Sequence, residues 1–144
     1  MSWTCPQCDR TFGRRRAHVC ERGMPVEYWL AERPDGQREA AMRIVELARS
    51  INGVTVEAVN VGVLIKRERS IVELRPKMKW LQLSVIALRP LAATARARVA
   101  RVVQWGSNMT AYFVRLTAGS DIDREMRVWL HEALRGPRKS RARR

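Results

Sequence analysis

The residues of this 144-residue chain best suited to chemistry are four potential metal ligands that lie close together near its N-terminus. They are Cys5, Cys8, His18 and Cys20, and they include all three cysteines of the chain. A C-x-x-C pair in a tight turn points two sulfur atoms at one place, and alternate side chains of an extended segment point the same way. Three thiolates and one imidazole complete a tetrahedron without an open position, which predicts a small knuckle around one structural Zn²⁺.

Three other interpretations of the cluster are reduced cysteines near a mobile N-terminus, an iron–sulfur site and a C-x-x-C redox site. The first does not explain why all the cysteines fall, with a histidine, within sixteen residues. A redox motif is expected beside a βαβ unit, and no such pattern surrounds this one. Disulfides are not expected, because the cysteine count is odd and a reducing compartment keeps thiols free.

The charge of the chain is strongly positive, with 28 basic and 14 acidic residues and a formal net charge of +14. The surplus is concentrated at the two ends, since residues 1–22 carry a net +3 and residues 135–144 a net +6. A field of this size favours polyanions: nucleic acid first, an anionic membrane second and an acidic protein third. An arginine-rich genome and a solubilising surface would give the same composition without any partner.

The loop of nine residues between the two pairs of ligands contains three consecutive arginines. A DNA-reading zinc finger places a helix there and needs about twelve residues, so we expect contacts to phosphate rather than base reading in the major groove. Alternatively, the loop simply needs soluble residues. Trp3 and Phe12 would stack unpaired bases or, as is commoner for such aromatics, form the core of the knuckle. The residues predicted to contact phosphate are Arg14, Arg15, Arg16, Arg138, Lys139, Arg141, Arg143 and Arg144, with Arg96, Arg98 and Arg101 as further candidates.

The segment behind the knuckle predicts two helices. Residues 26–32 fit a short helix, which is followed by a turn at Pro34-Asp35-Gly36. Residues 37–51 fit an amphipathic helix, and Asn52-Gly53 is a natural C-cap for it. The side chains expected to anchor these helices are Tyr28, Trp29 and Leu30 in the first and Ala41, Ile44, Val45, Ala48 and Ile51 in the second.

From residue 54 the apolar period becomes two, which predicts strands. The connections are too short for crossovers, so we expect antiparallel neighbours. Residues 89–104 are ambiguous, because alanine and arginine favour a helix whereas the closing VARVVQW fits a strand equally well. The predicted strands are 54–58, 61–67, 70–75, 79–88 and 109–117, and the core face of the fourth consists of Leu81, Leu83, Val85 and Ala87.

The last predicted element is an amphipathic helix. Ser120 is expected as its N-cap, with Asp123 completing a variant capping box. Gly136-Pro137 should stop this helix, and residues 136–144 should form a disordered basic tail. Its expected apolar face consists of Ile122, Met126, Trp129, Leu130 and Ala133.

These elements predict an α+β protein. A small antiparallel sheet, arranged as a meander, is flanked by an N-terminal and a C-terminal helix and preceded by the zinc knuckle. The expected organisation is a knuckle at 1–23, an aromatic linker at 24–36, the α+β domain at 37–135 and the basic tail at 136–144.

The stretch WTCPQCDRTF, then His18 and Cys20, then a helix, a β-meander and the closing VRLTAGSDIDREMRVWLHEA resemble an uncharacterised bacterial family. This family is the domain of unknown function DUF5655, often found behind an N-terminal CCHC-type zinc knuckle. The resemblance covers roughly residues 1–135. It implies a YdhG-like α+β fold and supplies no activity.

The sequence favours a binding protein and not an enzyme. It contains no Ser/His/Asp set, phosphate-binding glycine loop or carboxylate metal cluster. No apolar run is long enough to span a bilayer and no signal peptide is present, so we expect a cytoplasmic protein. The first hypothesis is a zinc-stabilised protein that binds DNA or RNA through backbone contacts, and the alternative is a protein–protein interaction or regulatory adaptor module with an acidic partner.

Overall fold

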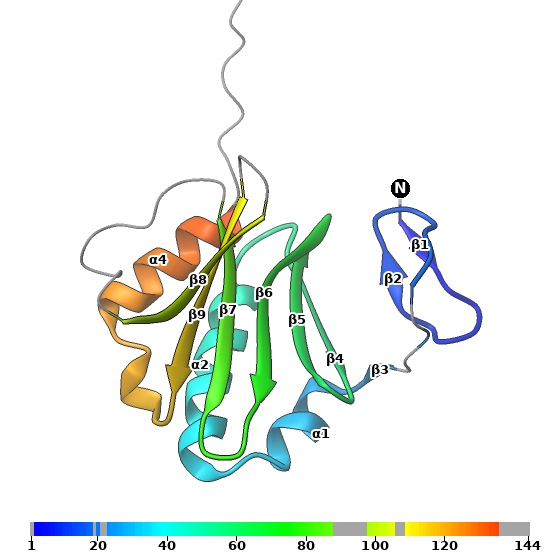
Figure 1. Ribbon diagram of the computed structural model, residues 1–144. Coiled ribbons are helices and arrows are strands. Elements are labelled where there is room, and N and C mark those ends of the chain that lie inside the picture. Colours follow the sequence, from blue (N-terminus) through cyan, green and yellow to red (C-terminus); the bar gives the residue numbers. More distant parts are fainter. Residues whose placement is uncertain (1, 19, 21–22, 88–97, 106–108, 136–144) are drawn as a thin grey trace, which may run out of the picture.

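The computed structural model describes residues 2–18, 20, 23–87, 98–105 and 109–135 (Figure 1). Within them, a small N-terminal hairpin stands beside one large antiparallel sheet with helices packed on it. The elements are β1 (Trp3–Thr4), β2 (Thr11–Phe12), β3 (Gly23–Met24), α1 (Val26–Ala31), α2 (Asp35–Arg49), β4 (Thr55–Val59), β5 (Gly62–Arg67), β6 (Arg69–Pro76), β7 (Leu81–Ala87), β8 (Val99–Trp105), β9 (Met109–Leu116), the 3₁₀ turn η1 (Gly119–Asp121) and α4 (Arg124–Arg135).

The seven-stranded sheet has the order β3-β4-β5-β6-β7-β9-β8, and each recorded pair is antiparallel. The meander predicted from the sequence holds from β4 to β7 and then breaks, because β9 lies between β7 and β8. Ala111 and Leu116 of β9 are fully buried, whereas Val102 of β8 is 53% exposed. The more buried strand thus takes the interior position, and the more exposed strand forms the edge of the sheet.

The core lies between the sheet and the helices α2 and α4, which cover one of its faces (Figure 1). The predicted core face of β7 is confirmed for Leu81, Leu83 and Val85, each fully buried, while Ala87 is half-buried. The helices bury the residues that their 3.6-residue period indicates, such as Ile44 in α2. Within the described residues, none of the helices combines the length and the apolar character needed to cross a membrane.

The opposite face of the sheet carries no helix within the described residues, and we call it the open face (Figure 1). Its members are the side chains that alternate with the core residues along each strand. They are Glu57 of β4, Leu64 and Lys66 of β5, Ile71, Glu73 and Arg75 of β6, Gln82, Ser84 and Ile86 of β7, Arg101 and Val103 of β8, and Ala111, Phe113 and Arg115 of β9.

The first two helices differ from the prediction. Tyr28 is 60% exposed, so Trp29 and Leu30 anchor α1 without it. Asp35 and Gly36 belong to α2, with Pro34 in the N-cap position, rather than forming a turn. A Cβ atom on Gly36 would lie only 2.1 Å from the carbonyl oxygen of Thr117. Glycine therefore brings the start of α2 against the backbone that follows β9, a contact that a turn prediction cannot anticipate.

The last helix also begins later than predicted, at Arg124. Asp123 rather than Ser120 is the N-cap, since its Oδ1 accepts the backbone N–H of Met126 at 3.0 Å. Asp121 instead accepts the N–H groups of Thr117 and Ala118, which holds this segment as the turn η1. Within residues 89–104, the described part from 99 is a strand, while 89–97 and the predicted tail at 136–144 lie outside the described residues.

Candidate metal centre and its junction with the sheet

The knuckle is built on the short hairpin of β1 and β2, in which Trp3 pairs with Phe12. The C-x-x-C turn closes this hairpin through two backbone hydrogen bonds. The Cys5 N–H donates to the carbonyl oxygen of Arg10 (2.9 Å), and the Asp9 N–H donates to that of Cys5 (2.8 Å). This turn places Cys5 and Cys8 side by side, 4% and 2% exposed.

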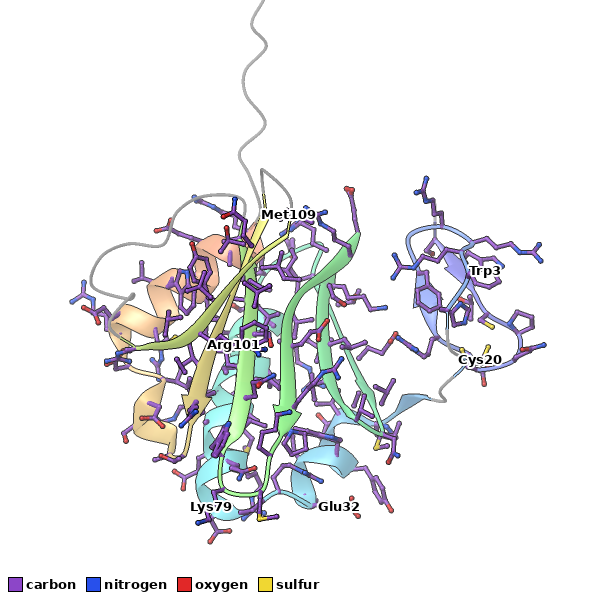
Figure 2. All side chains as sticks on the ribbon, in the orientation of Figure 1. Trp3, Cys20, Glu32, Lys79, Arg101 and Met109 are labelled. Carbon is purple, nitrogen blue, oxygen red and sulfur yellow. The ribbon has the colours of Figure 1, made fainter. Side chains whose placement is uncertain are left out.

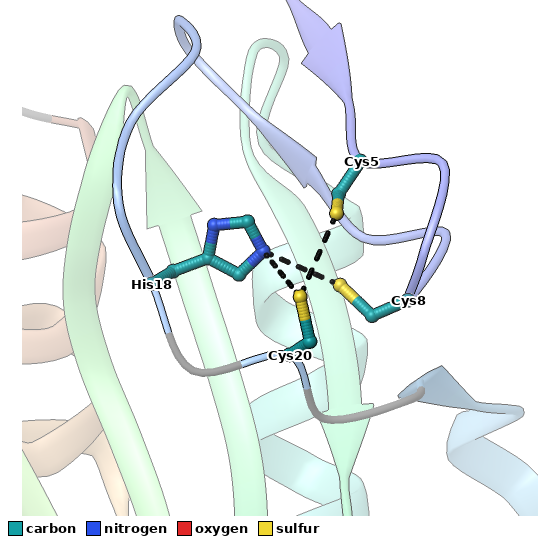
Figure 3. A group of neighbouring side chains, drawn as sticks. All are labelled: Cys5, Cys8, His18 and Cys20. Carbon is teal, nitrogen blue, oxygen red and sulfur yellow. Dashed lines mark hydrogen bonds between the residues drawn. The ribbon is translucent and has the colours of Figure 1, made fainter.

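The four predicted ligands converge on one point, as Figure 3 shows. Their ligand atoms all lie within 4.8 Å of one another. The sulfur atoms of Cys5 and Cys20 are 3.8 Å apart, and the Nε2 atom of His18 lies 3.4 Å from the sulfur of Cys8 and 3.5 Å from that of Cys20. The expectation that His18 and Cys20 point the same way is confirmed by this last distance.

These separations fit one tetrahedral metal ion. Sulfur and nitrogen ligands lie about 2.3 Å and about 2.0 Å from Zn²⁺, so a tetrahedron separates two sulfurs by about 3.8 Å and a sulfur from a nitrogen by about 3.5 Å. The Cys5–Cys20 sulfur separation and the two distances from His18 Nε2 to sulfur agree with these values. With four protein ligands no position stays open for substrate, so the centre is suited to holding structure rather than to catalysis.

The imidazole of His18 is oriented by its second nitrogen. Nδ1 lies 2.9 Å from the carbonyl oxygen of Arg16, and donation by Nδ1–H leaves the lone pair of Nε2 facing the sulfurs. The ring is also packed, with its centroid 4.3 Å from that of Phe12 and 5.9 Å from that of Trp3. Trp3 and Phe12 therefore form the small apolar core of the knuckle.

The thiols have unequal proton affinities. Burial opposes ionisation of Cys5, but hydrogen bonds from the backbone N–H groups of Cys8 and Gln7 outweigh it and lower the pKa to about 6. Burial, and then the neighbouring sulfur of Cys5, raise the pKa of Cys20 to about 11. The raised pKa favours a protonated Cys20 thiol near neutral pH, and a metal ion that takes this sulfur as a ligand must displace the proton.

The arginines of the ligand loop are exposed, and two of them stack on the knuckle core. The guanidinium carbon of Arg15 lies 5.8 Å from the ring centroid of Trp3, and that of Arg16 lies 5.1 Å from the ring centroid of Phe12. A guanidinium stacked in this way keeps its edge N–H groups available to an anion. The aromatic rings that could have stacked bases are instead occupied within the knuckle.

The knuckle is joined to the open face of the sheet by an ion-pair network. Glu57 of β4 receives Arg10 Nε at 2.8 Å and Lys66 Nζ at 3.4 Å. These three side chains are 18%, 11% and 8% exposed, respectively, so the network is largely shielded from water. Since Glu57 and Lys66 belong to the open face, the knuckle stands at one end of that face.

Lys66 also binds the knuckle directly. Its Nζ donates to the carbonyl oxygen of Thr11 (3.2 Å) and lies 4.7 Å from the ring centroid of Phe12. Burial lowers the pKa of Lys66, and Glu57 opposes this effect. The lysine charge is thus held between a carboxylate, a carbonyl and an aromatic ring, which ties the metal centre to β5.

The other candidate phosphate contacts have different positions. Arg98 is committed to Asp123, whose Oδ1 it binds at 3.1 Å, and is therefore a structural residue. Arg101 lies on the open face, over the ring of Phe113. Arg96 lies outside the described residues, as do Arg138, Lys139, Arg141, Arg143 and Arg144.

Two features of the site were missed by reasoning from the sequence. The first is the junction of Arg10, Glu57 and Lys66, which joins segments far apart in the chain. The second is the set of arginine–aromatic pairs on the open face, Arg101 with Phe113 and Arg115 with Trp80. The alternation of β9 signals that Phe113 and Arg115 share a face, but not that this face lacks a helix.

Comparison with known proteins defines the family of the main domain. The family model described as domain of unknown function (DUF5655) matches residues 26–135. The chain belongs to this family. The DUF5655 match starts at the first residue of α1, so the metal centre precedes it. No curated protein and no solved structure matches the chain.

Proposed function

We propose that this DUF5655 protein is a zinc-stabilised nucleic-acid-binding protein that contacts the phosphate backbone through its knuckle. The supporting observation is that the arginine loop is anchored at both ends by metal ligands, with Arg15 and Arg16 stacked on Trp3 and Phe12. Fixing the loop before binding lowers the entropy lost when a polyanion is bound. The role proposed for the metal is to hold this loop, and the protein is proposed to bind rather than to catalyse.

Zn²⁺ is the proposed metal because three thiolates and one imidazole at tetrahedral separations suit it better than harder cations. The net charge of +14 supplies the long-range attraction for a polyanion. Contacts of this kind read little base sequence, and they weaken steeply as salt displaces them.

The test is fluorescence anisotropy with single-stranded DNA, duplex DNA and structured RNA over a range of salt. The variant R14A/R15A/R16A should bind all sequences more weakly and reduce the slope of log K against log salt by about 2–3. The matched control is R124A/R127A/R135A, which removes the same charge from α4 in the helix layer. An equal loss of nucleic-acid affinity in both variants would show that only the net charge of the protein matters, and it would contradict the proposal.

The alternative is a protein-interaction module, since the fixed knuckle and the open face also offer a surface to an acidic partner. Capture from a lysate treated with nuclease separates the two functions. A defined partner that is lost with R14A/R15A/R16A but kept with the α4 control, together with no retention of nucleic acid at physiological salt, would favour this alternative.

A further inference from the structure

The strand registers place side chains of the open face in three rows that run across the strands, and Figure 2 labels Arg101 of one of these rows. The first row is apolar, with Ile86 beside Ala111 and Ala111 beside Val103. The second row passes from Glu73 through Ser84 and Phe113 to Arg101. The third row is Arg75, Gln82 and Arg115. Apolar, aromatic and basic side chains therefore lie in adjacent lines on one surface.

Two arginines of this face stack on aromatic rings. The guanidinium carbon of Arg101 lies 4.4 Å from the ring centroid of Phe113, and that of Arg115 lies 4.5 Å from the ring centroid of Trp80. Phe113 and Trp80 are both half-buried, and both arginines are exposed. Each pair presents a flat π-surface together with N–H donors at its edge.

The charges of this face leave a positive excess. Of its two carboxylates, Glu57 is neutralised by Arg10 and Lys66, and Glu73 lies 3.4 Å from Arg75. Within the part of the chain that the structure describes, no ion pair is recorded for Arg101 or for Arg115. Their charges are therefore available to a negatively charged partner.

The charge is also divided unevenly between the segments of the chain. Residues 26–51 and 118–135, which include the helices, contain seven basic and nine acidic residues, a net −2. Residues 52–117, which include the strands β4 to β9, contain eleven basic and three acidic residues, a net +8. The segments that contain the helices thus do not share the positive surplus of the strand segment. Two cations of the strand segment do not serve the open face, since Arg67 donates to the carbonyl oxygen of Leu134 and Arg98 binds Asp123.

We propose that the open face binds single-stranded nucleic acid, with bases against the Arg101–Phe113 and Arg115–Trp80 pairs and phosphates on the exposed arginines. This inference deepens the proposed function and rests on it, because the knuckle stands at one end of the same face. Stacking requires the flat faces of the bases, which a duplex hides and a single strand offers. A second copy of this chain is disfavoured as the occupant, because two faces of like charge would meet.

The experiment compares two labelled probes, an oligothymidylate of about 12 nucleotides and an abasic oligomer of the same length and charge. The wild-type protein, loaded with Zn²⁺, should prefer the oligothymidylate at physiological salt. F113L should weaken that binding by about tenfold and leave the abasic oligomer unaffected, because leucine keeps the apolar contact and removes the ring. The variant R101A/R115A should reduce the salt slope with either probe by about 1.4.

The controls separate a direct contact from a change in folding. Y28L removes an exposed aromatic ring from α1, in the helix layer, and should bind both probes like the wild type. Because Arg101 and Arg115 are exposed, R101A/R115A should also melt like the wild type. If F113L bound normally while R14A/R15A/R16A bound weakly, the proposed function would stand and this inference would be wrong.

Two further results would overturn the inference. Equal affinity of the wild type for the two probes would exclude base stacking. Self-association in sedimentation experiments that F113L abolishes would assign the face to a second copy of the chain. A failure of every probe to bind at physiological salt would remove the proposed function as well as this inference.

Discussion

Arg10 of the knuckle and Glu57 of β4 are 47 residues apart in the sequence, and a 2.8 Å ion pair between them fixes the candidate metal centre on the sheet. Lys66 completes the junction by binding both Glu57 and the carbonyl oxygen of Thr11. Because β3, which follows the knuckle in the sequence, also pairs with β4, a second contact with the sheet lies close to the knuckle along the chain. The knuckle is therefore docked against β4 and β5 at one end of the open face.

Metal binding is the first prediction. The chain should bind one Zn²⁺ or Co²⁺, and C5S should weaken this binding strongly because three protein ligands leave an incomplete tetrahedron. H18C should retain the metal, since four thiolates also suit Zn²⁺, whereas H18A should bind it weakly. Titration with Co²⁺, followed by its absorption spectrum, measures this. Unchanged binding by C5S would disprove the four-ligand centre.

Loss of the carboxylate of Glu57 should destabilise the protein much more than loss of the ammonium group of Lys66. E57Q should destabilise the metal-loaded protein by about 2–4 kcal/mol, because it leaves the shielded cations Arg10 and Lys66 without a counter-charge. K66M should cost less, since it removes a buried charge and keeps an apolar chain of similar length. Thermal or denaturant unfolding measures both. The reverse order would show that Lys66 and not Glu57 is the essential member.

The dependence of this junction on the metal can be measured by a double-mutant cycle between R10M and E57Q. The coupling energy should be about 1–2 kcal/mol in the metal-loaded protein. After chelation it should fall close to zero, because the hairpin that carries Arg10 loses its order. A coupling that survives chelation would mean that the knuckle keeps its position without metal.

The start of α2 provides a steric prediction. G36A should destabilise the protein by about 1–3 kcal/mol, because its Cβ would meet the carbonyl oxygen of Thr117, a backbone atom that cannot move aside easily. The matched control is G23A, whose Cβ would lie 3.5 Å from its nearest neighbour, an ordinary contact. Urea unfolding compares the two. Equal stability would place Gly36 farther from Thr117 than the structure does.

The pH dependence of stability should reveal the pair formed by Arg98 and Asp123. The hydrogen bond from Arg98, followed by that from the Met126 N–H, lowers the pKa of Asp123 below its ordinary 3.8. A depressed pKa in the folded state contributes stability above pH 3.8, and this contribution is lost as the pH falls through the folded-state value. D123N keeps an N-cap and removes the charge. The difference in melting temperature between wild type and D123N should therefore shrink as the pH is lowered from above 3.8 through the folded-state pKa of Asp123. A difference that stays constant would argue against the pair of Arg98 and Asp123.

The sequence by itself determined the features that depend on near neighbours in the chain. Cys5, Cys8, His18 and Cys20 were found because a tight turn and an extended segment place ligands by local geometry. The buried sides of α2 and β7 followed from the periods of a helix and a strand. These patterns are local, because each depends only on residues close together in the sequence and indicates which side of a helix or strand is apolar.

Only the tertiary structure decided what lies against those sides. The alternation in β9 marks its two faces, but its place between β7 and β8 depends on competition among strands distant in sequence. The start of α4 at Arg124 follows from Asp123 capping it while Arg98 pairs with that carboxylate. The docking of the knuckle depends in the same way on Glu57 and Lys66, because the energy of a charge is set by its spatial neighbours and its exposure to water.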